Sequence, residues 1–400
     1  MACLARILAQ PDVRGYAFGM LRKVVPCLVL GALVSVAAEG HAAKKPTVHA
    51  RVVHGPQAPH AAAHASSEPT KAAEPHTPKA SQGSLSGKTT LEPDFQAKVL
   101  KILDESRAPG GAIVVSDVRT GRVLAWATRG PGDWVKEAAT PSASVFKIAT
   151  TAALLERRKV SLTTKQCYSD TEHGITPGDL EDGPRDIGCA HFGEALGLSI
   201  NGVFARLALK HLTPGELRST AQNIGFGGKV PADIDAPFGD FSIPDDRLGF
   251  ARSSAGFWNA KLSPLGALFA MQTIANDGEK VKLVTHAGDA TPQRISLGRA
   301  MTTETARAMR QMLEVTTKRG TAAKAFHEDG KPALGNVRVA GKTGTLVGGH
   351  PVRMVSWFAG FAPVDSPKIA VAVLLSNDVS WWSKGNQVAR RVFEAYFEKP

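Results

Sequence analysis

The sequence lacks the patterns that would direct its positive charge towards nucleic acid. Its 400 residues include 48 Lys and Arg against 36 Asp and Glu, a formal net charge of +12. Such an excess favours anionic partners in general, from nucleic acid to anionic lipid or an acidic polymer. The cysteines form no CxxC pair and no zinc-finger spacing, and no Gly-rich phosphate loop of the GxxxxGK(S/T) kind occurs. These absences exclude the common nucleic-acid modules, so we expect no nucleic-acid partner.

The sequence also lacks an apolar run of the ~20 residues that a membrane-spanning helix needs. Its most apolar stretch, residues 24–38, follows the basic pair Arg22 and Lys23 and ends among small residues. This pattern is typical of a secretory signal. We expect residues 1–43 to be a signal peptide or an uncleaved N-terminal anchor held in the membrane through residues 24–38. The chain is therefore predicted to be exported, to the periplasm or the outer face of the cytoplasmic membrane.

Residues 44–90 contain almost no large apolar side chains and are rich in Ala, Pro and His. Such a segment cannot bury enough surface to offset the entropy of ordering it. We expect a disordered linker over 44–90, followed by one folded domain over 91–400. His60 and His64 have a spacing that suits a metal on a helix, but the Pro-rich context favours solvated side chains. We expect no metal site.

Cysteine is scarce in the mature chain. Cys3 and Cys27 fall in or before the signal, which leaves Cys167 and Cys189. These two either form a disulfide or remain separate thiols. Export and the irregular polar segment between them favour a disulfide.

The apolar patterns after residue 91 predict an α+β domain. Helical spacing covers residues 93–106, and two β-rich runs follow at 112–116 and 122–127. A long middle region, about 148–335, shows helices and loops without a strong strand. Three more strands are expected at 337–346, 354–361 and 369–376, then a helix at 384–397. Both ends of the chain would share one sheet with the middle inserted as a helical lobe, and a groove between them is a natural active site.

The first chemical motif is Ser144-Val145-Phe146-Lys147 at the start of an expected helix. Residues three apart lie on one helix face, so the Lys147 amine can reach the Ser144 hydroxyl. A serine becomes a nucleophile when a neighbour accepts its proton, and a lysine of lowered pKa can do so. The competing interpretation is a helix N-cap serine followed by a surface lysine.

The second motif is Ser199-Ile200-Asn201. Ser199 is a candidate proton relay between Lys147 and a leaving group, and the Asn201 amide is a candidate binder of a substrate peptide group. An ordinary helix cap is the alternative interpretation.

The third motif is Lys342-Thr343-Gly344-Thr345 on an expected strand. Alternation places Lys342 and Gly344 on one face and Thr343 and Thr345 on the other. Lys342 would supply a positive charge that attracts a substrate carboxylate, and Thr343 would supply a hydroxyl that binds it. The backbone N–H groups of Thr345 and Ser144 would form an oxyanion hole.

The ordered trio Ser-x-x-Lys, Ser-x-Asn and Lys-Thr-Gly resembles that of penicillin-binding proteins and serine β-lactamases. Further stretches across 91–400 resemble the penicillin-binding transpeptidase domain: Asn223 to Gly227, Leu262 to Leu265, Ile274 to Gly278, Arg319 to Ala322 and Ser356 to Pro363. The resemblance implies a five-stranded antiparallel sheet flanked by helices, beside an inserted all-helical lobe. It also implies a Ser144 acyl-enzyme formed from D-Ala-D-Ala stem peptides of peptidoglycan, β-lactams as covalent inhibitors, and no cofactor.

Several functions within this superfamily remain open. A D,D-transpeptidase or D,D-carboxypeptidase is favoured because no Glu-x-x-Leu-Asn motif lies between Asn201 and Lys342 to position a deacylating water. A serine β-lactamase of the class D kind is the next alternative, although Asn201 stands where class D enzymes usually have valine. A non-enzymatic β-lactam-sensing or cell-wall-binding domain is the third.

Overall fold

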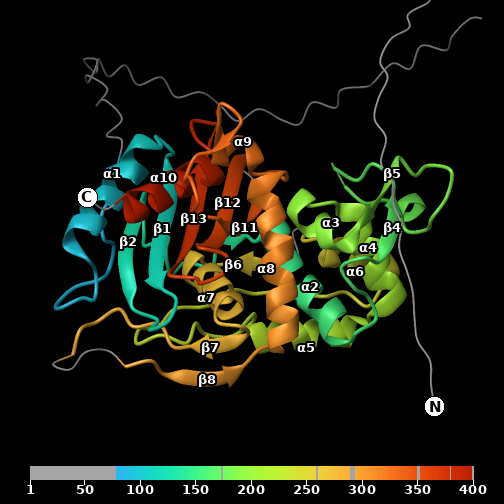
Figure 1. Ribbon diagram of the computed structural model, residues 1–400, viewed down its shortest axis with the longest axis horizontal. Coiled ribbons are helices and arrows are strands. Elements are labelled where there is room, and N and C mark those ends of the chain that lie inside the picture. The colour runs from blue at the N-terminus through green and yellow to red at the C-terminus, as the bar shows by residue number, and fades with distance from the viewer. Residues whose placement is uncertain are drawn as a thin grey trace, which may run out of the picture. The chain divides into compact units, whose positions relative to one another are not determined.

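The computed structural model describes residues 78–172, 174–257, 260–288, 293–348, 352–378 and 380–398 (Figure 1). The predicted signal or anchor, and the linker up to residue 77, lie outside the described residues. Over the ranges given, no helix has the length and apolar character needed to cross a membrane.

A five-stranded antiparallel sheet joins the two ends of the domain, as predicted (Figure 1). Its order is β11-β12-β13-β1-β2, and β1 pairs with β13 from Gly110 opposite Ser376 to Asp117 opposite Ile369. The strands are β1 Gly110–Asp117, β2 Val123–Arg129, β11 Ala340–Gly348, β12 Arg353–Ala362 and β13 Ile369–Asn377.

Helices cover both faces of this sheet, which explains why its central strand is apolar from Ile369 to Leu375. All nine residues of β13 are buried, as expected of a strand between two helical layers. Ile369, Val371 and Val373 belong to the core beneath α1 (Pro93–Glu105) and α10 (Gly385–Phe397). The alternate residues face the opposite core, which contains α7 (Pro264–Ala275).

Helix α7 is buried at every position, so no polar stripe marks it as a surface helix. It begins at Ser263, whose Oγ accepts a hydrogen bond from the Gly266 N–H at 3.0 Å and caps the first turn. The helix packs against β1, β12 and β13 and is the main support of the sheet on this side.

The helical lobe follows the predicted insertion between the two parts of the sheet (Figure 1). Its helices are α2 Lys147–Glu156, α3 Phe192–Leu198, α4 Asn201–His211, α5 Pro214–Ile224 and α6 Arg247–Ser254. Helix α8 (Thr303–Lys318) contacts both α3 of the lobe and β11 of the sheet. It therefore ties the two parts together along the groove.

Short ladders also occur in the middle region, where the sequence predicted no strand. They are β3–β6 (Thr140–Pro141 with Lys261–Leu262), β4–β5 (Lys165–Tyr168 with Gly188–His191), β7–β8 (Glu279–Val281 with Ser296–Arg299) and β9–β10 (His327–Glu328 with Lys331–Pro332). Strands of two to four residues show too few alternations for a pattern to reveal them. The remaining helical turns are η1 Ala143–Phe146, η2 Pro177–Asp179 and α9 Ala323–Phe326.

The folded domain begins before residue 91, so the predicted end of the linker lies too far along the chain. Ser81 forms a two-way backbone pair with Thr128 of β2 at 2.8 and 2.9 Å. The buried Thr90 hydroxyl donates to the Val123 carbonyl at 2.8 Å. This segment is held by backbone pairing to an edge strand, which its polar side chains do not reveal.

The core supported by α7 gives a stability prediction. Leu268→Ala should lower the free energy of unfolding by about 2–5 kcal/mol, because it removes a side chain that is 0% exposed and leaves a cavity. Leu297→Ala, at a position 39% exposed in β8, should change it by less than about 0.5 kcal/mol. Urea unfolding of the two variants measures the difference, and equal losses would contradict the packing described.

Candidate active site

Ser144 lies on η1, in a turn fixed by contacts to both sides of the groove. The residue before it, Ala143, has a positive φ of 49°, a backbone conformation that costs a non-glycine residue energy. The Ser142 N–H donates to the Ala260 carbonyl at 2.8 Å, and the Trp357 indole donates to the Pro141 carbonyl at 2.9 Å. These bonds hold the strained turn against the sheet.

Gly256 allows this turn to lie against the end of α6. A Cβ at Gly256 would stand 2.3 Å from the Ala143 carbonyl oxygen, and the residue has a φ of 84°. Only glycine meets both requirements without strain. The sequence analysis did not single out Gly256, because a lone Gly carries no signal of what it approaches.

Lys147 is completely buried, and its amine contacts the Ser144 hydroxyl. The Nζ atom lies 2.7 Å from each of three oxygens: Ser144 Oγ, Asn201 Oδ1 and the Ala255 carbonyl. Burial lowers the pKa of Lys147 well below its usual value, and the charge of Lys342 lowers it further. As a neutral amine, Lys147 can donate to Asn201 and Ala255 and accept the proton of Ser144.

Ser199 and Asn201 lie beside Lys147 at the junction of α3 and α4. Ser199 ends α3 in the left-handed conformation, with φ 59°, and Asn201 is the first residue of α4. The Asn201 NH₂ group donates to the Thr171 carbonyl at 2.9 Å. That contact leaves the amide oxygen facing Lys147.

The β11 motif forms the opposite side of the groove. Lys342 is fully buried, and its Nζ donates to Ser199 Oγ and to the Thr343 carbonyl, both at 2.9 Å. Burial lowers the pKa of Lys342 to about 7. As predicted, Lys342 and Gly344 turn inward, whereas Thr343 and Thr345 line the cleft. A Cβ on Gly344 would lie 3.2 Å from Ala143 Cβ, so this glycine lets the strand approach the serine turn closely.

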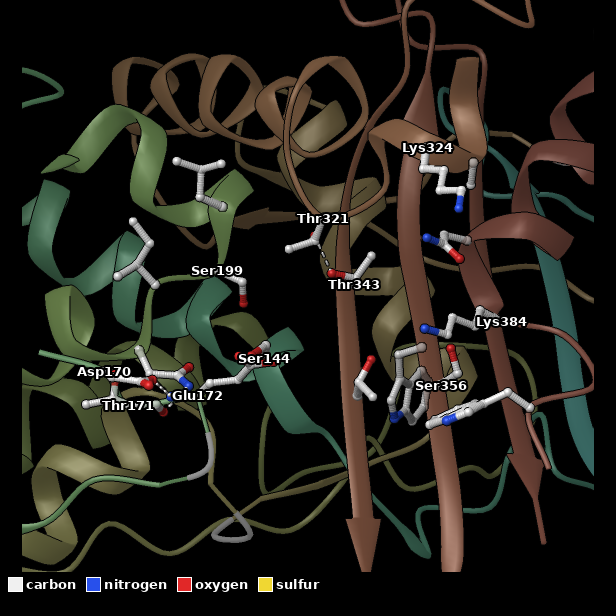
Figure 2. Close-up of a pocket in the computed structure, with 18 of the residues that line it drawn as sticks. Ser144, Asp170, Thr171, Glu172, Ser199, Thr321, Lys324, Thr343, Ser356 and Lys384 are labelled. Atoms are coloured by element: carbon white, nitrogen blue, oxygen red, sulfur yellow. Dashed lines mark hydrogen bonds between the residues drawn. The ribbon is translucent and has the colours of Figure 1, made fainter. Parts of the chain in front are cut away.

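A cleft of about 810 Å³ connects these motifs. Figure 2 shows Asp170, Thr171 and Glu172 on its lobe side and Thr343, Lys324 and Lys384 on its sheet side, with Ser144 and Ser199 between them. The two walls therefore carry side chains of opposite charge.

The structure thus brings together the eight predicted site residues: Ser144, Lys147, Ser199, Asn201, Lys342, Thr343, Gly344 and Thr345. Among the cleft residues that sequence reasoning did not name is Thr321, whose hydroxyl lies 2.6 Å from that of Thr343. It follows α8 in a stretch that the family resemblance had included, which was the available signal. Lys324 and Lys384 had no such signal, and the carbonyls of Thr171 and Ala255 have no side-chain signature at all.

Cys167 and Cys189 face each other in the β4–β5 ladder and are joined by a disulfide. The bond closes the polar segment that includes the lobe wall. No group of three or more His, Cys, Asp or Glu side chains suited to a metal ion occurs within the described ranges.

Residues 111–398 match the family described as penicillin binding protein transpeptidase domain, and the chain belongs to this family. Stage V sporulation protein D of Bacillus subtilis is 26% identical over 347 residues, covering 76% of this chain and 52% of that protein. Peptidoglycan D,D-transpeptidase PbpA of Mycolicibacterium smegmatis is 28% identical, covering 59% of this chain and 50% of that protein. The chain spans about half the length of these relatives.

Solved structures share the fold. The transpeptidase domain of penicillin-binding protein 3 from Burkholderia pseudomallei superposes with a TM-score of 0.62 at 26% identity, covering 77% of this chain and 93% of that one. The ceftriaxone acyl-enzyme complex of Mycobacterium tuberculosis penicillin-binding protein A gives 0.63 at 23% identity, covering 77% and 79%. The predicted fold class, a five-stranded antiparallel sheet with an inserted helical lobe, is confirmed.

The close approach of Gly256 to the serine turn leads to a testable prediction. Gly256→Ala should displace the Ala143 carbonyl and slow covalent labelling of Ser144 by a fluorescent penicillin about tenfold or more, which corresponds to ~1.4 kcal/mol of lost positioning. Gly298→Ala is the matched control, because Gly298 also has a positive φ, 77°, but has open space around its Cβ position. It should share the cost of the left-handed backbone, about 1–2 kcal/mol of stability, and label at the normal rate. Equal labelling of both variants would show that the turn tolerates the displacement.

Proposed function

We propose that this chain is a peptidoglycan D,D-transpeptidase/D,D-carboxypeptidase that acts on D-Ala-D-Ala stem peptides through a Ser144 acyl-enzyme. The observation that carries the proposal is the contact of Lys147 Nζ with Ser144 Oγ at 2.7 Å, inside a site that also joins Asn201 and, through Ser199, Lys342. Membership of the family supports the proposal. So do the similarity to the D,D-transpeptidase PbpA of Mycolicibacterium smegmatis and the similarity to the transpeptidase domain from Burkholderia pseudomallei.

In the first half-reaction, Ser144 Oγ attacks the carbonyl carbon between the two D-alanines while its proton moves to neutral Lys147. The backbone N–H groups of Ser144 and Thr345 are the proposed oxyanion hole, and both residues line the cleft. Collapse of the intermediate breaks the C–N bond. The leaving D-alanine takes a proton from Lys147 through the Ser199 hydroxyl, which lies next to Lys342.

The terminal carboxylate of the substrate would bind on the sheet side. Protonated Lys342 supplies positive charge beneath this wall, and Thr343 and Thr321 present hydroxyls to it. With the carboxylate bound there, the peptide bond between the two terminal D-alanines would lie towards Ser144.

In the second half-reaction, a neutral amine of another stem attacks the ester carbonyl carbon, so that a C–N bond forms and the bond from that carbon to Ser144 Oγ breaks. The proton that the amine loses passes through Lys147 to Ser144 Oγ and restores the hydroxyl. Water in place of the amine gives the carboxypeptidase product. No resident cofactor enters either step. The carboxylates of Asp170 and Glu172 on the lobe wall suit an acceptor that arrives as a cationic ammonium group and loses a proton before it attacks, which favours aminolysis in this proposal.

β-Lactams are the expected covalent inhibitors, because the strained amide mimics the D-Ala-D-Ala bond and keeps its leaving group tethered. Penicillin-binding protein A of Mycobacterium tuberculosis forms acyl-enzyme complexes with ceftriaxone and imipenem. We further propose that this domain works outside the cytoplasm, in the periplasm or at the outer face of the membrane, where its substrate would be found.

Labelling with a fluorescent penicillin tests the proposal directly. The wild-type protein should be labelled, Ser144→Ala should not, and Lys147→Ala should be slowed roughly 10²- to 10⁴-fold because a general base is lost. Lys101→Ala removes an exposed lysine on α1 and should label normally. Labelling of Ser144→Ala at the wild-type rate would contradict the proposed nucleophile, and mass analysis of products from a D-Ala-D-Ala peptide with and without an amine separates the two activities.

The pH dependence of acylation should report Lys342. Its pKa of about 7 means that the cation is present below pH 7 and is lost above it. Acylation by a substrate with a free carboxylate should therefore fall as the pH rises through about 7. The corresponding ester should lack this decline, because it makes no ion pair with Lys342. Both substrates should share the decline at low pH that protonation of Lys147 causes. The same alkaline decline for both would rule out the carboxylate role.

A further inference from the structure

The segment closed by the Cys167–Cys189 disulfide lies between the active site and a buried arginine. It consists of the described residues between β4 and β5, and it is called here the disulfide loop. Thr171 of this loop is 5% exposed, and its carbonyl accepts the Asn201 NH₂ group at 2.9 Å. The loop thus reaches the site through a backbone oxygen.

This contact decides which way the Asn201 amide points. An amide has a donating NH₂ end and an accepting oxygen, and the Thr171 carbonyl can only accept. With the NH₂ group held at Thr171, the amide oxygen lies 2.7 Å from Lys147 Nζ. If the amide turned round, its NH₂ group would face the lysine and Lys147 would lose one of its acceptors.

Arg206 of α4 holds the other side of the disulfide loop. Its side chain is 1% exposed, and Nε donates to the Asp179 carbonyl at 2.8 Å. Nη1 donates to the Cys167 carbonyl at 2.9 Å and contacts the Asp186 carboxylate at 2.7 Å. A buried guanidinium is tolerated only when such acceptors surround it, so Arg206 and the loop fix each other.

Hydrogen bonds within the disulfide loop and packing against the start of α4 also hold it in place. The Asp179 carboxylate accepts from Ser169 Oγ at 2.7 Å and from Thr176 Oγ1 at 2.6 Å. A Cβ on Gly202, next to Asn201, would lie 3.4 Å from Thr171 Oγ1, so the loop packs directly on the start of α4. The Cys167 carbonyl that Arg206 holds lies only four residues before Thr171, so we expect the contacts of Arg206 to position Thr171.

We propose that Arg206 and the Cys167–Cys189 disulfide are positioning groups for the reaction: through the Thr171 carbonyl they fix the Asn201 amide, and with it the hydrogen bonding of Lys147. The inference rests on the proposed function, because acylation of Ser144 is its readout. Neither Arg206 nor the cysteines touch the substrate. In acylation by a penicillin, which needs no amine acceptor at the lobe wall, we expect their effect on the rate to pass through Asn201.

A double-mutant cycle tests this route. Arg206→Lys keeps the charge but loses most of the donors, and it should slow labelling of Ser144 by a fluorescent penicillin about tenfold, the usual order for one lost hydrogen bond at a charged partner. In an Asn201→Ala background the same change should have less than about a twofold effect, because the group through which it acts is gone. Equal slowing in both backgrounds would overturn the proposal and indicate general destabilisation.

Two further variants are included, so that the test does not depend on whether Arg206→Lys folds. Arg157→Lys is the matched control, since Arg157 is a partly buried arginine that pairs with Glu216 at 2.8 Å and makes no contact with the loop in the bonds described; its labelling rate should be unchanged. Cys167→Ser/Cys189→Ser removes the disulfide, and it should slow labelling in the wild-type background but not beside Asn201→Ala. A folded double-serine protein that labels at the wild-type rate would exclude the disulfide from the mechanism. Absence of labelling in the wild-type protein would instead contradict the proposed function.

Discussion

The site depends on the burial of one amine, that of Lys147. With no solvent around it, the charged form of Lys147 is disfavoured, and its pKa is lowered further by the charge of Lys342. A buried amine still needs acceptors for its N–H groups, and these come from two other segments, Asn201 on α4 and the Ala255 carbonyl at the end of α6. The helices of the lobe must therefore pack in one arrangement for Ser144 to have a base.

The sheet contributes a second buried lysine, Lys342. The two parts of the fold therefore each supply one lysine, and the two lysines have different roles. The lobe holds the amine that accepts a proton, whereas β11 holds Lys342, which remains charged below about pH 7. Backbone strain lies next to both lysines, at Ala143 shortly before Lys147 and at Ser199, which contacts Lys342. The surrounding contacts keep these two residues in their strained conformations, as strained residues at functional sites require.

Sequence reasoning succeeded where a pattern repeats and failed where the chemistry belongs to the backbone. The strands of the large sheet and the helices α1 and α10 show several periods of alternation or helical spacing, and their ends agree with the structure within a few residues. The two-residue ladders, such as β3–β6, show none. Ser144, Lys147 and Lys342 could be named because their side chains carry the chemistry. Thr171 and Ala255 act through carbonyls, which every residue possesses, so only their positions identify them.

The disulfide loop shows why a polar segment can hold a catalytic amide in place without a core of its own. It is held by a covalent bond, by the acceptors around Arg206, of which the Asp179 and Cys167 carbonyls are two, and by Ile175 and Leu180, which are buried in the larger core. Because a buried guanidinium is costly when any of its partners is missing, these contacts form together or are lost together. In the proposal made above, this network holds the Thr171 carbonyl in place, and the Asn201 amide that the carbonyl orients supplies one of the acceptors of Lys147.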